Sequence, residues 1–300
     1  MTAANDREYA YTERDFQRVS AMIRSRAGIS LAQGKQDMVY SRIARRLRAL
    51  KIDSFSDYLD FLENDHGCDE WEHFTNALTT NLTAFFRESH HFDILSQHLG
   101  TLHGKDRILI WCAAASTGEE PYSLAITACE HFGTLQPPVQ ILATDIDTNC
   151  LETAARGVYP IDRVEKLAAE RLRRFFRRGT GSREGYCKVV DELQQMITFR
   201  QLNLLDNSYG LRGPFDAVFC RNVMIYFDKP TQYSILKRIV PLLTRDGLFF
   251  AGHSESFFHA TDLIRPVGRT VYRLAEGAAG AGAESIASHR KSGILCQAQT

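Results

Sequence analysis

A series of short apolar runs, each separated from the next by a helical pattern, constrains the fold of this chain most strongly. The runs are ILIWCA at 108–113, VQILATDID at 139–147, ITFRQLNLL at 197–205, FDAVFCRNV at 215–223, LFFAGHS at 248–254 and TVYRLA at 270–275. Apolar runs of this length that alternate with helices are typical of a mainly parallel sheet covered on both faces. We therefore predict a doubly wound, Rossmann-like α/β domain over residues 107–275.

The N-terminal part of the chain has a different periodicity. From Glu13 to about Arg87 apolar residues recur three and four positions apart, as in Phe16, Val19 and Ile23, which indicates amphipathic helices. The 300 residues are enough for two domains that each bury a core. We predict a small all-α domain over residues 1–88 and a linker over 89–106.

Two later segments interrupt the α/β pattern. Residues 163–195 contain a basic helical piece, then the turn-rich GTGSREG at 179–185, then the strand-like YCKVV. We interpret this segment as an inserted subdomain that carries a β-hairpin. Residues 276–300 are rich in small residues, and we predict a disordered tail there.

Charge is balanced over the whole chain but not along it. The 36 Lys and Arg residues equal the 36 Asp and Glu residues, which argues against a protein dedicated to binding nucleic acid. Residues 35–51, however, hold six basic residues against one acid, whereas residues 52–72 hold eight acids and no Lys or Arg. A helix over 35–51 would place an apolar stripe beside an arc of guanidinium groups. The stripe is Val39, Ile43, Leu47 and Leu50, and the arc contains Arg42, Arg45 and Arg46.

This arc of arginines has two interpretations. It can be a solvated face that pairs with the neighbouring acids, as most surface charges do. It can also be a docking surface for an acidic partner, because guanidinium groups bind carboxylates with two parallel hydrogen bonds.

The cysteines and the chain start indicate an intracellular protein without a metal site. The seven cysteines are odd in number, widely spaced and not grouped with histidines at metal-ligand spacing. Cys112 and Cys220 lie within apolar runs, where a cysteine is usually a small buried hydrophobe. No apolar run approaches the length of a membrane span, and residues 1–11 lack the apolar segment of a secretory signal. We expect a cytoplasmic protein that does not insert into membranes.

The turn after the first predicted strand carries the first candidate ligand site. Residues 113–123 read AAASTGEEPYS, which combines small residues with two carboxylates and lacks the glycine patterns of phosphate-binding loops. Asp145 ends the second strand, where an acid typically binds the ribose hydroxyls of an adenosine. The alternative role, a helix cap, suits Asp147 or Thr148 better. An adenosine site without a phosphate site favours S-adenosylmethionine over nucleotides.

Several longer motifs resemble those of one family. They are TTNLTAFFRESHHF at 79–92, WCAAASTGEEPYS at 111–123, ATDID at 143–147, NLL at 203–205, FDAVFCRNVMIYFDKPTQ at 215–232 and GLFFAGHSESF at 247–257. By these motifs the chain resembles the CheR-type chemotaxis receptor methyltransferases, from its N-terminal helices to Leu274. The resemblance implies a class I methyltransferase domain behind a receptor-docking helical domain. It also implies S-adenosylmethionine as cofactor, with S-adenosylhomocysteine as product.

The family's activity is then expected of this chain. Such enzymes methylate glutamate side chains on the cytoplasmic helices of chemoreceptors, giving glutamate methyl esters for adaptation. The resemblance places the following residues in the cofactor site: Asn81, Thr83, Arg87, Glu120, Asp145, Asn203, Leu204, Arg221 and Asn222. We expect Asp145 to hold the ribose, Asn203 and Leu204 to lie near the adenine, and Arg221 and Asn222 to lie beside the methionine part.

Two residues are candidates for a catalytic role. A glutamate side chain is already a carboxylate at neutral pH, so its methylation requires alignment and the removal of water rather than a general base. We expect Arg87 to orient the substrate carboxylate and Tyr226 to lie near the transferred methyl. Without the family resemblance, the sequence would predict an ordinary surface arginine at Arg87 and a core aromatic residue at Tyr226.

The resemblance also suggests two surfaces that bind the receptor. Arg42, Arg45 and Arg46 would face its glutamate-rich helices. Gly179, Gly181 and Gly185 match a hairpin with which some family members capture a peptide at the receptor's carboxyl terminus by strand addition. These glycines can equally be plain turn residues.

Two other functions compete with this one. One is a binding module that senses S-adenosylmethionine or its product and signals by interaction, without turnover. The other is methylation of a nucleic acid or small molecule, although the chain lacks the [DNS]PP[YF] signature of amino-methylating enzymes and has Arg221-Asn222-Val223-Met224 instead. We expect the receptor methyltransferase to act as a monomer.

Overall fold

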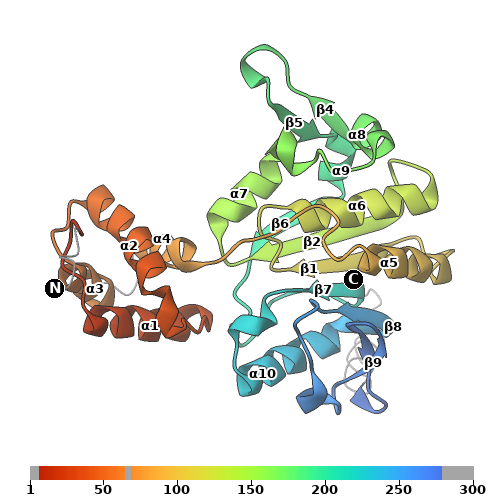
Figure 1. Cartoon of the computed structure of the whole chain (residues 1–300). Coiled ribbons are helices and arrows are strands. Elements are labelled where there is room, and N and C mark those ends of the chain that lie inside the picture. Colours follow the sequence, from red (N-terminus) through yellow and green to blue (C-terminus); the bar gives the residue numbers. More distant parts are fainter. Residues whose placement is uncertain (1–6, 65–68, 279–300) are drawn as a thin grey trace, which may run out of the picture.

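The computed structural model describes residues 7–64 and 69–278, which form a helical domain beside an α/β domain (Figure 1). The helical domain contains α1 (Glu13–Ala27), α2 (Gln36–Leu50), α3 (Phe55–Asn64) and α4 (Glu70–Leu78). Apolar side chains at helical spacing, including Val19, Ile43 and Leu59, are fully buried where these helices meet. The prediction of amphipathic helices here is confirmed, except that Leu50 at the end of α2 is exposed.

The α/β domain is built on a seven-stranded sheet. Its strands are β1 (Ile108–Ala113), β2 (Val139–Asp145), β6 (Ile197–Gln201), β7 (Phe215–Cys220), β8 (Leu243–Phe250), β9 (Ile264–Gly268) and β10 (Val271–Leu274). They lie in the order β6-β2-β1-β7-β8-β10-β9. The first five strands are parallel, and β10 is antiparallel to both β8 and β9. The predicted doubly wound sheet is confirmed, and β9 is a strand that the apolar runs did not reveal.

Helices cover both faces of this sheet. One core layer joins α5 (His90–Thr101) and α6 (Glu119–Phe132) to the sheet, and the opposite layer packs α10 (Lys229–Ile239). The crossover helix α7 (Thr148–Arg156) contacts β2 and β6. Cys112 and Cys220 are fully buried, as predicted. Because β2, β1 and β7 are parallel neighbours, their carboxyl ends meet at one edge of the sheet, as expected for this fold.

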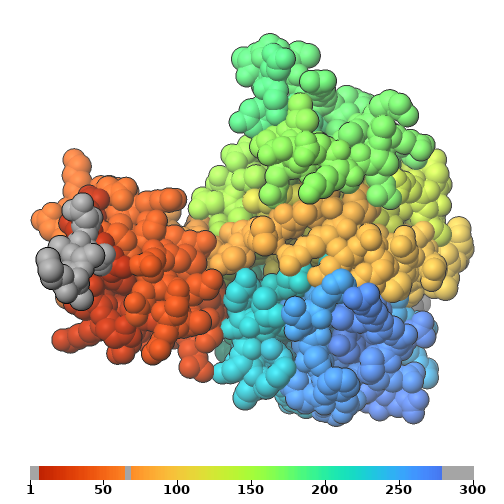
Figure 2. Space-filling view, in the orientation of Figure 1, coloured from red at the N-terminus to blue at the C-terminus, as the bar shows by residue number. Residues whose placement is uncertain are grey.

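The inserted segment forms a small sheet of its own. Strands β3 (Val158–Pro160), β4 (Phe176–Arg178) and β5 (Tyr186–Val189) are antiparallel in the order β3-β5-β4, accompanied by α8 (Ala169–Phe175) and α9 (Asp191–Gln195). The predicted hairpin is present as β4–β5, and it projects from the surface (Figure 2). The subdomain begins at β3, before residue 163, because β3 pairs with β5 to complete the sheet.

The segment between the two domains differs from its prediction. Residues 89–106 are not a simple linker: they include α5, whose Leu95 and Leu99 are fully buried in the α/β core. The extended connection between the domains is shorter and precedes α5, at residues 79–84. Within residues 7–64 and 69–278, no helix combines the length and apolar character of a membrane span. Of the predicted disordered tail at residues 276–300, all but residues 276–278 lies outside the described residues.

Candidate functional site

A cavity of about 260 Å³ lies where the helical domain meets the carboxyl edge of the sheet. Its walls come from the loop between α1 and α2, the connection at residues 79–83, and the ends of β1, β2 and β7. All of the predicted cofactor residues line it: Asn81, Thr83, Arg87, Glu120, Asp145, Asn203, Leu204, Arg221 and Asn222. Tyr226 lines it as well. The topology therefore brings together residues that are distant in the sequence.

The turn after β1 approaches the cavity with its backbone. Ala114 and Ser116 have left-handed φ angles of 63° and 50°, a backbone conformation that is uncommon for residues other than glycine. Gly118, with φ 97°, lies so close to Ala154 and the hydroxyl of Tyr159 that a side chain at this position would collide with both. Tight packing on α7 and β3 thus holds the turn that begins α6 and positions Glu120.

Asp145 at the end of β2 is held in place by backbone donors. Its Oδ2 accepts from Ser116 N at 2.7 Å and its Oδ1 from Asp147 N at 2.9 Å. Burial raises the pKa of Asp145 to about 6, although these hydrogen bonds lower it in part. Asp147 caps α7 by accepting from Cys150 N, so the capping role belongs to Asp147, as predicted. The Asp145 carboxylate remains on the cavity wall, where it can accept hydrogen bonds from hydroxyl groups.

The segment after β6 forms the opposite wall and contacts the helical domain. Asn203 Nδ2 donates to the carbonyl of Arg26 at 2.8 Å, and its Oδ1 accepts from Leu205 N at 3.0 Å. Leu204 is buried beside it. An apolar side chain next to a fixed amide can hold a heteroaromatic ring such as adenine.

The connection between the domains crosses the cavity and is tied to α7. Asn81 Nδ2 and Thr79 Oγ1 both donate to Asp147 Oδ2, each at 2.7 Å. The side chain of Asn81 is thus used to hold the connection, and its backbone carbonyl accepts from Ser116 Oγ at 3.0 Å. Thr83 O accepts from Arg163 of the inserted subdomain at 3.1 Å. The connection is therefore fixed from two sides.

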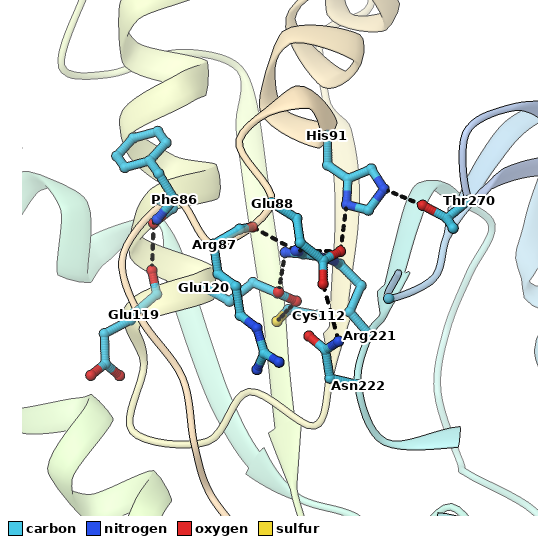
Figure 3. A network of polar contacts seen from close by, with 12 residues as sticks. Phe86, Arg87, Glu88, His91, Cys112, Glu119, Glu120, Arg221, Asn222 and Thr270 are labelled. Carbon is cyan, nitrogen blue, oxygen red and sulfur yellow. Dashed lines mark hydrogen bonds and ion pairs between the residues drawn. The ribbon is translucent and has the colours of Figure 1, made fainter. Parts of the chain in front are cut away.

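Arg221, at the end of β7, is the centre of a buried ion-pair cluster (Figure 3). Only 1% of its side chain is exposed, and it pairs with Glu120 at 2.5 Å and Glu88 at 3.1 Å. Its Nη2 also donates to the carbonyl of Arg87 at 2.5 Å. Burial alone would lower the pKa of Arg221, but the two carboxylates raise it, so the group is a permanent cation.

The side chain of Arg87 points away from this cluster (Figure 3). Its Nη1 donates to the carbonyl of Leu82 at 2.8 Å, and its guanidinium group is on the cavity wall. Tyr226 lies in a short helical turn, and its carbonyl accepts from Ser30 N at 3.3 Å, which joins this wall to the helical domain. Both candidate catalytic residues therefore line the cavity.

Two carboxylates of the site were missed by sequence analysis, although both lie in motifs that suggested the family. Glu88 has a left-handed φ of 58° and accepts from Asn222 Nδ2 at 3.1 Å. Glu255 is buried and accepts from the backbone of Gly252, Asn222 and Met224. Together they hold Asn222, whose own φ is 58°.

The arc of arginines on α2 is only partly available to a partner. Arg42 Nη1 donates to the carbonyls of Ala77 and Thr79 at the end of α4. Arg46 binds Glu70 with two hydrogen bonds, at 2.9 and 2.6 Å. Arg46 thus pairs with a neighbouring acid, as the first of the two interpretations expected, whereas Arg42 binds backbone carbonyls and Arg45 is exposed.

The backbone conformation of the hairpin turn accounts for its three glycines. Gly179 lies against the backbone of Arg183, where a Cβ would come within 2.1 Å of the carbonyl oxygen. Gly181 and Gly185 have φ angles of 59° and 86° in open space. The turn therefore requires glycine whether or not it binds a peptide.

The donors and acceptors around the cavity fit S-adenosylmethionine. Asp145 suits the ribose hydroxyls, Glu120 suits a cationic group, and the exposed backbone of residues 114–116 permits close approach.

Family models match almost the whole of the described chain. The CheR methyltransferase all-alpha domain matches residues 14–79, and the CheR methyltransferase SAM binding domain matches residues 81–273. Chemotaxis protein methyltransferase 2 of Pseudomonas aeruginosa is 54% identical over 268 residues, which cover 89% of this chain and 95% of that protein. The chemotaxis protein methyltransferase of Salmonella typhimurium is 51% identical over 267 residues, 89% of this chain and 92% of that protein. The chain, with S-adenosylmethionine as its cofactor, therefore belongs to the CheR methyltransferase family.

Proposed function

We propose that this methyltransferase modifies the side-chain carboxylates of glutamates on the cytoplasmic helices of chemoreceptors. The observation that carries the proposal is the Arg87 guanidinium on the cavity wall, turned away from the buried ion-pair cluster. Its one hydrogen bond to a carbonyl leaves further N–H groups for a substrate carboxylate. The relatives named as chemotaxis protein methyltransferases support the same substrate class.

The geometry suits a reaction that depends on alignment. When bound, S-adenosylmethionine supplies a methyl group on a positively charged sulfur. Glu120 and Asp145 would hold its ammonium group and ribose, while Asn203 and Leu204 would flank the adenine. Arg87 would orient the attacking carboxylate, and Tyr226 would form the wall beside it.

The decisive experiment is methyl transfer from labelled cofactor to receptor-containing membranes. A glutamate methyl ester releases its label as volatile methanol in alkali, whereas methylated nitrogen keeps it. We expect alkali-labile label on receptor peptides that contain glutamate. Label that is stable in alkali, or that appears on nucleic acid, would refute the proposed substrate.

Substitution of Arg87 tests its place in the reaction. Arg87→Ala should lower the rate of methyl transfer at least about a hundredfold, because the carboxylate loses its alignment. Arg48→Ala, at an exposed pair with Glu8, is the matched control and should keep full activity. Normal turnover by Arg87→Ala would exclude the proposed role.

We further propose that the β4–β5 hairpin captures a peptide at the receptor's carboxyl terminus. Strand β4 is an edge of its sheet, and its Arg177 and Arg178 are exposed. A peptide strand could pair with this edge while a guanidinium group binds its terminal carboxylate. Replacing both arginines by glutamate should weaken binding of a receptor tail peptide at least about tenfold, with the affinity for the cofactor unchanged. Equal peptide affinity in both proteins would refute the tether.

A further inference from the structure

Glu88 gives Arg221 a second carboxylate partner, which is not among the residues that line the cavity. Its side chain is 8% exposed, and it contacts Arg221 at 3.1 Å, Asn222 Nδ2 at 3.1 Å and His253 N at 3.3 Å. Burial alone would raise the pKa of Glu88, but the hydrogen bond from Asn222 and the charge of Arg221 lower it below its usual value. Glu88 is therefore ionised at neutral pH.

The cluster carries one more negative charge than positive charge. Arg221 supplies one cation, whereas Glu88 and Glu120 supply two anions. The neighbouring His91 adds no charge, because burial lowers its pKa to about 3. Of the two carboxylates, Glu120 lines the cavity and Glu88 does not. A pair of Arg221 with Glu120 alone would be neutral and would present little field to a cationic ligand.

We propose that Glu88 is a positioning residue that balances Arg221 and so leaves the negative charge of Glu120 for the cationic cofactor. Glu88 touches neither the cavity nor a reacting group and acts through Arg221. In this arrangement the charge selects the ligand: S-adenosylmethionine carries a sulfonium charge that S-adenosylhomocysteine lacks. The charged carboxylate of Glu88 therefore raises the affinity for S-adenosylmethionine relative to that for S-adenosylhomocysteine.

Calorimetric binding of both ligands tests this inference. Glu88→Gln keeps the size of the side chain but removes its charge. The affinity for S-adenosylmethionine relative to S-adenosylhomocysteine should fall about fivefold. Glu88→Asp, which keeps the charge, should restore most of the ratio. Glu184→Gln in the exposed hairpin turn is the matched control and should leave the ratio unchanged.

The ratio of the two affinities distinguishes an electrostatic role of Glu88 from a merely structural one. Loss of packing would weaken both ligands alike, because they share the adenosine and the amino acid part. An unchanged ratio in Glu88→Gln would overturn the proposal even if both affinities fell. Should that variant not fold, His253→Lys provides the second test, because the His253 ring lies 3.9 Å from the Glu88 carboxylate and is 40% exposed. A cation placed there should lower the ratio in the same direction, and an unaltered ratio would again overturn the proposal.

Discussion

The two domains each bury an arginine–carboxylate cluster, and the two clusters do different things. In the helical domain Arg46 binds Glu70 with two hydrogen bonds, and the Tyr58 hydroxyl donates to the same carboxylate at 2.8 Å. In the α/β domain Arg221 binds Glu88 and Glu120. The first cluster has equal numbers of cations and anions and lies away from the cavity, whereas the second has an excess anion on the cavity wall.

This difference shows why residue type alone does not identify a functional arginine. Both clusters satisfy the rule that a buried charge must be paired. A balanced pair holds its elements together and presents no net charge to a ligand. An unbalanced cluster keeps a charge at the surface of the cavity, and the site can use that charge for binding. Three predictions test this distinction.

The largest effect is expected from Arg221→Ala. The substitution leaves Glu88 and Glu120 without their common cation in a buried site, and breaking such a cluster costs about 4 kcal/mol of unfolding free energy. Urea unfolding followed by circular dichroism measures this loss. The exposed pair of Arg48 and Glu8 provides the control, because Arg48→Ala should cost about 0.5 kcal/mol or less. Equal stability of the two variants would contradict the structural part of the argument.

Arg46→Ala should destabilise the protein without changing the cofactor site. It removes one partner of Glu70, which is 5% exposed, while the Tyr58 hydroxyl remains. We expect a loss of about 3 kcal/mol, less than for Arg221 because the Arg46 side chain is 23% exposed. The affinity for S-adenosylhomocysteine, measured by calorimetry below the unfolding temperature, should stay within about twofold. A large loss of affinity would mean that the two clusters are coupled.

The fold was largely predictable because its signals are local. The apolar runs located β1, β2, β6, β7, part of β8 and β10, and the rule that parallel strands end at one edge led to Asp145. Strand β3 was missed because it is short and pairs with β5, which lies later in the inserted segment. Strand β9 was missed because only its first residue, Ile264, is buried, so it leaves no apolar run. The helix α5 was taken for part of a linker, although its buried Leu95 and Leu99 follow a helical spacing.

The candidate site was predictable only in part, for a physical reason. Asp145 could be argued from its position in the fold, whereas the other cofactor residues were inferred from family motifs. Glu88 and Arg221 are separated by more than a hundred residues in the sequence, so no local pattern reveals that they pair. The sequence allowed a pair between the arc of arginines and the acids of residues 52–72, as Arg46 and Glu70 form, but no local pattern indicated that Arg42 binds the carbonyls at the end of α4.

The smallest expected effect concerns Asp145, a lone buried carboxylate that no arginine neutralises among the described residues. Its pKa of about 6 means that it gains a proton as the pH falls from 7 to 5. A protonated carboxyl group accepts ribose hydroxyls poorly, so the affinity for S-adenosylmethionine should fall roughly tenfold at pH 5, one unit below this pKa. In the cofactor-free protein, the same titration changes the folding stability in the opposite direction. Folded Asp145 holds its proton more tightly than the unfolded chain does, so its own contribution to stability increases as the pH falls below about 6.

Asp145→Asn is the control that isolates this titration. The variant should bind the cofactor more weakly at pH 7, because an amide cannot accept from both Ser116 N and Asp147 N. Its binding profile between pH 5 and 7 should be flatter than that of the native protein. Calorimetry at three pH values in buffers of equal ionic strength gives both profiles. An equally steep profile in Asp145→Asn would assign the pH dependence to another group and remove the contrast between a lone carboxylate and the paired clusters.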